Sequence, residues 1–126
     1  MTRSPQARPR RRAPRLATRL VGSLAGRVAH PVTVLDLSLT GCLVQCGKLL
    51  DHGAILALDV DVLGQPVSAR VRVAESYVDG SAATEPSAGY LAGLEFVGLP
   101  PRETDCLRRF LDEERRRRQR ADAPAQ

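Results

Sequence analysis

Apolar residues occupy every second position in two neighbouring segments in the middle of the chain, residues 54–62 and 67–73. The opposite face carries aspartates in the first segment and arginines in the second. Because successive side chains of an extended chain point to opposite faces, this period predicts two half-buried β-strands. Residues 63–66, with the sequence LGQP, predict a short hairpin loop between them.

The same kind of pattern predicts four more strands, and a polar, flexible loop precedes the last of them. We expect a turn near Gly26 between the first two strands of the chain and a connection through residues 47–53. All connections are short enough for antiparallel neighbours, and a sheet of short strands avoids exposed edges by closing on itself. The predicted fold class is therefore all-β, a six-stranded antiparallel β-barrel. The four additional strands are expected at residues 17–24, 28–37, 42–46 and 90–97.

After Pro100 and Pro101 the spacing changes to that of a helix, through residues 102–118. Apolar residues then fall on one face, acidic residues lie in the first turn, and arginines crowd the end, which matches the helix dipole. We expect a short amphipathic helix that caps one end of the barrel, with a solvated basic tip; contact of that tip with DNA or an anionic membrane is the alternative. The apolar face comprises Leu107, Phe110 and Leu111, and the expected i,i+4 ion pairs are Asp112–Arg116, Glu113–Arg117 and Glu114–Arg118.

Composition divides the 126 residues into three parts. Residues 1–14 form an Arg- and Pro-rich arm, residues 15–114 the barrel and helix, and residues 115–126 a basic tail. Neither end can bury enough apolar surface to offset the entropy of ordering, so we expect the arm to be mobile and the tail to be frayed or disordered. The net charge is +5, but only two Phe, two Tyr and no Trp are present, which disfavours a nucleic-acid surface built on base stacking.

The three cysteines do not form a disulfide framework, because their number is odd and their spacing sparse. Cys42 and Cys46 would share one strand face, and we interpret them as small core side chains rather than metal ligands. No apolar run suggests a signal peptide or a membrane span, so we expect a protein of the reducing cytoplasm. The sequence also contains no Walker loop, nucleophile elbow or HExxH motif, which argues against an enzyme and predicts neither a metal nor a cofactor.

The segment DLSLTG, residues 36–41, follows a predicted strand and has the composition of a turn. Upstream, Arg11 and Arg15 bracket three residues at the end of the arm, which could fold back over this turn. Arginine forks suit phosphates and the N7 and O6 edge of guanine, whereas a carboxylate such as Asp36 accepts hydrogen bonds from the guanine N–H donors. Such a pocket would take an anionic, phosphorylated ligand that is rich in guanine.

These two motifs, RxxxR at Arg11–Arg15 and DxSxxG at Asp36, Ser38 and Gly41, resemble the PilZ domain family. The resemblance extends to GLEF at residues 93–96 and to the C-terminal helix. It implies a six-stranded barrel that serves as a receptor for cyclic di-GMP and signals to a downstream protein partner. It further implies that the two arginines grip guanine and phosphate, that Asp36 and Ser38 read guanine, and that Gly41 permits the close turn.

The register of the arginine motif is open, because Arg8–Arg12 and Arg15–Arg19 also fit RxxxR. We prefer Arg11–Arg15 because the strand pattern begins at Leu16. Arg10 lies directly before the motif, a position that in the family accompanies an intercalated ligand dimer, so the resemblance implies two nucleotides per domain. The alternative function is a small Arg-rich barrel that binds nucleic acid or a protein without cyclic di-GMP.

Overall fold

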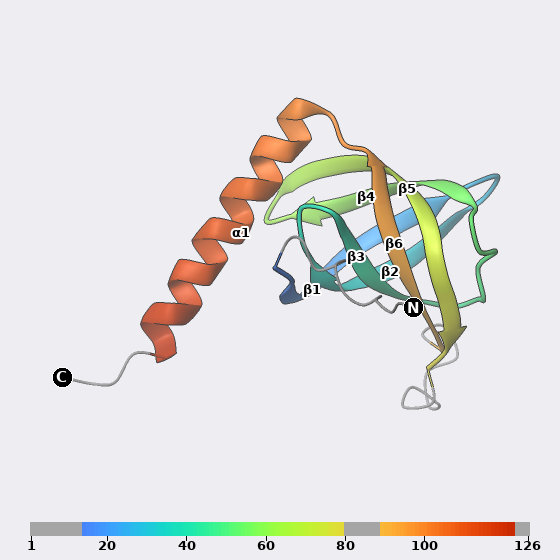
Figure 1. The fold of residues 1–126 in the computed structure, drawn as a ribbon, viewed down its shortest axis with the longest axis horizontal. Coiled ribbons are helices and arrows are strands. Elements are labelled where there is room, and N and C mark those ends of the chain that lie inside the picture. The colour runs from blue at the N-terminus through green and yellow to red at the C-terminus, as the bar shows by residue number, and fades with distance from the viewer. Residues whose placement is uncertain (1–13, 80–88, 123–126) are drawn as a thin grey trace, which may run out of the picture.

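The computed structural model of the protein describes residues 14–79 and 89–122. Six strands close into an antiparallel barrel in the order β1-β2-β3-β6-β5-β4, and a single helix follows the last strand (Figure 1). The predicted all-β barrel with a C-terminal helix is therefore confirmed. The elements are β1 Leu16–Ala25, β2 Ala29–Leu37, β3 Gly41–Cys46, β4 Ile55–Val62, β5 Gln65–Val78, β6 Tyr90–Gly98 and α1 Pro101–Asp122.

The core lies inside the barrel and consists of the inward-facing half of each alternating strand pattern. On β5, Val67, Ala69, Val71 and Val73 are all buried, while the residues between them are exposed. Because alternate side chains share a face, the period-two reading of this segment predicted the correct inner face. The other five strands supply further aliphatic core side chains, which include Leu24, Val34, Leu37, Val44, Leu58, Val60 and Leu94.

The hairpin between β4 and β5 turns on two residues, Leu63 and Gly64, with Val62 paired to Gln65. Both turn residues have positive φ, 53° and 86°, as a two-residue turn that follows the right-handed strand twist requires. The Asp61 carboxylate accepts a hydrogen bond of 2.7 Å from the Gly64 amide. The predicted hairpin is thus confirmed, but its loop has two residues and not four, because Gln65 and Pro66 already pair with β4. Gly64 serves the turn by tolerating a backbone conformation that other residues avoid.

The connection between β3 and β4 departs from the prediction that every connection joins antiparallel neighbours. β3 pairs with β6, whereas β4 pairs with β1 and β5. The connecting segment lies against β5: Gly53 N donates to Val73 O at 2.8 Å, and Val73 N donates to Ala54 O at 2.9 Å. The expectation was wrong here because barrel closure requires β4 to complete the pairing of β1, which places β4 away from the strand that precedes it.

Helix α1 is longer than the short cap expected, because it runs past residue 118, where the helical spacing was expected to end, to Asp122. Residues 115–122 of the expected frayed or disordered tail are therefore helical. Leu107 and Leu111 are each 1% exposed and join the barrel core, and the last turns of the helix extend beyond the barrel (Figure 1). No helix within residues 14–79 and 89–122 is long and apolar enough to span a bilayer.

The ion pairs of α1 differ in spacing from those predicted. Glu114 pairs with Arg118 at 3.5 Å, as expected for i,i+4. The expected Asp112–Arg116 and Glu113–Arg117 pairs do not form among the described residues. Three successive arginines instead reach back only three residues, which is physically reasonable because i,i+3 and i,i+4 positions are both neighbours on a helix surface. These pairs are Arg115–Asp112, Arg116–Glu113 and Arg117–Glu114, at 3.8, 3.1 and 2.7 Å.

Candidate ligand-binding site

Arg15 and Asp36 form an ion pair at the start of the barrel. Arg15 directly precedes β1, and Asp36 is the penultimate residue of β2, in a register that pairs Ala17 with Asp36. The Arg15 Nη1 donates to Asp36 Oδ1 at 2.6 Å, and their side chains are 36% and 24% exposed. The structure therefore brings one residue of each predicted motif together at the surface. Asp36 Oδ2 receives no hydrogen bond from any residue in the described ranges.

The Ser38 hydroxyl organises the turn between β2 and β3. Ser38 is 0% exposed, and its Oγ accepts hydrogen bonds from the amides of Thr40 and Gly41 at 3.1 and 3.2 Å. The Ser38 amide also donates to Gly41 O at 2.9 Å. A short hydroxyl side chain that bonds nearby backbone is the usual means of stabilising such a turn. In this structure the Ser38 hydroxyl is buried and bonded within the turn that follows Asp36, so the expected direct contact of Ser38 with guanine is not preformed and stays a prediction.

Gly41 is required by the strand next to it. A Cβ at this position would lie 2.2 Å from Leu94 O, because β3 and β6 pair closely with Gly41 opposite Glu95. The turn is further fixed to β6 by a hydrogen bond of 2.9 Å from Phe96 N to Thr40 O. The resemblance attributed Gly41 to a close turn, and the geometry adds a second cause, the approach of the β6 backbone.

Cys42 lies under the site, at the start of β3. It is 0% exposed, and Cys46 on the same strand is 1% exposed, so the prediction that both thiols are core side chains is confirmed. Burial raises the pKa of Cys42 to about 12; the negative charge of Asp36 adds to this rise, and Arg15 opposes it. A thiol of this kind stays protonated and is not a nucleophile at neutral pH. The described residues contain no group of three potential metal ligands.

Arg10 and Arg11 lie outside the described residues, so the structure places only the second arginine of the RxxxR motif. Sequence reasoning missed two other arginines at the same place. Arg115 and Arg118 of α1 donate to the carbonyls of Pro14 and Ala17, on either side of Arg15. Each contact joins residues 101 positions apart. The local pattern gave no signal for them, because within the helix they read only as part of a solvated basic tip.

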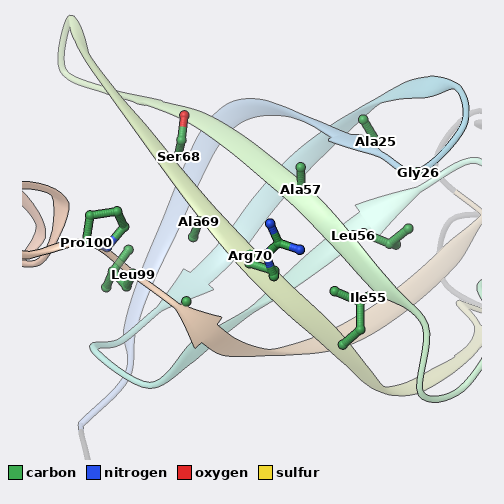
Figure 2. A pocket seen from close by; sticks show the side chains of 11 residues that line it. Ala25, Gly26, Ile55, Leu56, Ala57, Ser68, Ala69, Arg70, Leu99 and Pro100 are labelled. Atoms are coloured by element: carbon green, nitrogen blue, oxygen red, sulfur yellow. The ribbon is translucent and has the colours of Figure 1, made fainter.

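A shallow hollow of about 830 Å³ lies on the outer wall of the barrel, and its lining contains none of the predicted ligand residues. Figure 2 shows Arg70 near its centre, with Ala57 and Leu56 of β4 beside it. Its walls are mostly small or aliphatic side chains. The lining of this hollow includes Arg70 and Ser68 but no carboxylate, whereas Arg15 and Asp36 place a donor and an acceptor side by side next to the turn.

Comparison with known proteins agrees with these motifs. The family model of the PilZ domain matches residues 9–113, which is most of the chain and spans both motifs. The chain belongs to the PilZ domain family. No curated protein sequence matches it.

Solved structures with the same fold include other PilZ proteins at low sequence identity. The inhibitor of motility MotI/DgrA of Bacillus subtilis superposes with a TM-score of 0.73 at 15% identity, over 96% of this chain and 58% of that one. YcgR of Escherichia coli in complex with c-di-GMP gives 0.68 at 20%, over 90% and 50%. The isolated PilZ domain of YcgR with c-di-GMP gives 0.65 at 20%, over 92% and 100%. The chain therefore spans 58% and 50% of the first two proteins and the whole length of the third.

Proposed function

We propose that this PilZ domain is a receptor for cyclic di-GMP, a binding module rather than an enzyme. The observation that carries the proposal is the ion pair of Arg15 and Asp36 at 2.6 Å, which joins the two motifs on one exposed edge of the barrel. Two findings support it: the family model matches residues 9–113, and the PilZ domain of YcgR, which has the same fold, was solved with c-di-GMP.

The chemistry of the pair suits a guanine nucleotide. Asp36 is an acceptor-only group, and its Oδ2 is available for the N–H donors of guanine. Arg15 has a planar fork of donors, of which Nη1 is engaged by Asp36, so the remaining N–H groups can reach a phosphate or the guanine acceptors. We assign Asp36 and Arg15 to direct ligand contacts. Ser38 and Gly41 contribute to binding by holding the turn that follows Asp36 in place, so that the carboxylate can meet the base.

The N-terminal arm supplies the other half of the proposed site. Arg11 would complete the arginine clamp with Arg15, and Arg10 would contact a second nucleotide of an intercalated dimer. Ordering of the arm over the barrel would create a new surface, and a downstream protein partner would bind it. The free energy of ordering, on the order of 2–5 kcal/mol, has to be supplied by the charge-assisted contacts of these arginines.

Calorimetric titration with cyclic di-GMP, GTP and a short DNA duplex at two salt concentrations tests this function. We expect tight, saturable binding of cyclic di-GMP, weak binding of GTP, and severe loss of affinity in Arg15→Ala. Arg27→Ala is a matched control, because Arg27 is an exposed arginine in the turn at the other end of β1. Binding of DNA that falls steeply with salt, without binding of cyclic di-GMP, would instead support the nucleic-acid alternative.

A further inference from the structure

Two arginines of α1 hold the backbone on both sides of Arg15. Arg115 Nη2 donates to Pro14 O at 3.1 Å, and Arg118 Nη2 donates to Ala17 O at 2.7 Å. Since Arg15 lies between these two carbonyls, its position is fixed from the helix as well as from its own partner Asp36. The helix thereby contacts residues 14–17, here called the arm root, and not only the barrel core.

The two arginines are themselves held in place by carboxylates of the same helix. Glu114 is only 7% exposed, and it accepts bonds from Arg117 at 2.7 and 2.8 Å while pairing with Arg118 at 3.5 Å. Asp112 lies 3.8 Å from Arg115. A nearly buried carboxylate needs such partners, and once paired it restricts the rotamers of the side chains that surround it.

The helix beneath these arginines is anchored, so they have a fixed base. Leu107 and Leu111 are each 1% exposed within the barrel core, about two turns and one turn before Arg115, respectively. Arg116, by contrast, pairs with Glu113 at the surface, where both side chains are well exposed. Among the described residues, the hydrogen bonds of Arg115 and Arg118 are those that join the last turns of α1 to the backbone of residues 14–17.

We propose that Arg115 and Arg118 are positioning residues for Arg15, and that α1 is for this reason energetically coupled to the cyclic di-GMP site. The line of contacts runs from Glu114 and Asp112 to the two arginines, through the carbonyls flanking Arg15, and on to Asp36. This inference rests on the proposed function. Coupling is reciprocal, so ligand bound at Arg15 stabilises the last turns of α1, where a partner protein could sense it.

The first test needs no ligand. Amide hydrogen exchange of residues 15–18 is compared in the parent, in Arg115→Ala/Arg118→Ala and in the control Arg116→Ala. We expect exchange about 3- to 30-fold faster in the double variant, the range that coupling residues produce, and no change in the control. Arg118→Lys should lose less protection than the double variant, because lysine retains a donor for Ala17 O. Equal exchange in all four proteins would overturn the inference.

The second test measures affinity for cyclic di-GMP by calorimetry in the same proteins. Affinity should fall about 3- to 30-fold in the double variant and less than that in Arg118→Lys. It should stay at the parental value in Arg116→Ala. Faster exchange with unchanged affinity would show that the contacts are only structural and would contradict the positioning role. If the double variant does not fold, Arg115→Ala decides, since it leaves both partners of Glu114 intact.

The two proposals can fail separately. A parent protein that does not bind cyclic di-GMP contradicts the proposed function and the coupling to that ligand. The exchange experiment would still decide whether α1 positions Arg15. A parent that binds while the double variant matches it in both measurements would leave the receptor function intact and refute the role of α1.

Discussion

Asp36 has neighbours of two kinds, a charged arginine at the surface and an uncharged thiol beneath it. Arg15 Nη1 lies 2.6 Å from Asp36 Oδ1, and the negative charge of Asp36 helps to raise the pKa of the buried Cys42 thiol. The ion pair is partly exposed, so it contributes little to folding, typically about 0–1 kcal/mol. Its main consequence is therefore at the surface, where it holds an acceptor and a donor fork side by side.

Replacing Asp36 should separate binding from stability. Asp36→Ala should lower the affinity for cyclic di-GMP about tenfold or more, because unsatisfied donors of a bound base cost roughly 1–3 kcal/mol each. Thermal unfolding should change little, since the lost ion pair is partly exposed. Calorimetry and a melting curve measure the two quantities. Parental affinity in Asp36→Ala would exclude this carboxylate as a guanine acceptor.

Cys42 gives the protein an alkaline instability that can be predicted in sign. The folded thiol stays protonated until about pH 12, whereas an unfolded thiol ionises from about pH 9.0. Between these values the unfolded state binds fewer protons, so stability is lost as pH rises, by up to about 1.4 kcal/mol per pH unit. Urea unfolding at several pH values should show a shallower decline in Cys42→Ala than in the parent. Parallel declines would rule out this contribution.

At the scale of elements, the turn between β2 and β3 is rigid because both of its ends are fixed. The buried Ser38 hydroxyl bonds the amides of Thr40 and Gly41, and the Phe96 amide of β6 bonds Thr40 O. Gly41 then allows β3 to lie against β6. A ligand would thus meet a preformed carboxylate platform, which reduces the ordering cost on the barrel side of the site.

Gly41→Ala should be strongly destabilising, because the new methyl would lie 2.2 Å from the Leu94 carbonyl and neither backbone can yield easily. Overpacking of this kind costs typically 1–3 kcal/mol or more, which for a domain of this size lowers the melting temperature by about 4–8 °C per kcal/mol. Gly93→Ala is the matched control, since its methyl would meet the flexible Glu75 side chain at 3.1 Å. Equal melting temperatures for the two variants would disprove the steric explanation.

At the scale of the whole molecule, the sequence predicted the barrel better than its connections. Alternation on β5 identifies which side chains face inward, because the period of a strand is two, but it carries no information about which strand lies alongside. That is why β3 was expected beside β4. The meeting of Arg15 with Asp36 was anticipated from the two motifs, whereas the contacts of Arg115 and Arg118 with the arm root join positions 101 residues apart and have no local pattern.

The most direct test of the central claim is a map of the residues that respond to the ligand. In a ¹⁵N-labelled sample titrated with cyclic di-GMP, backbone signals of Arg15, of residues 36–41 and of the last turns of α1 should shift together and saturate. Signals of residues 55–57, which line the hollow of Figure 2 on the outer wall of the barrel, should not move. Shifts confined to the outer wall, or none at saturating nucleotide, would contradict a cyclic di-GMP site built on Arg15 and Asp36.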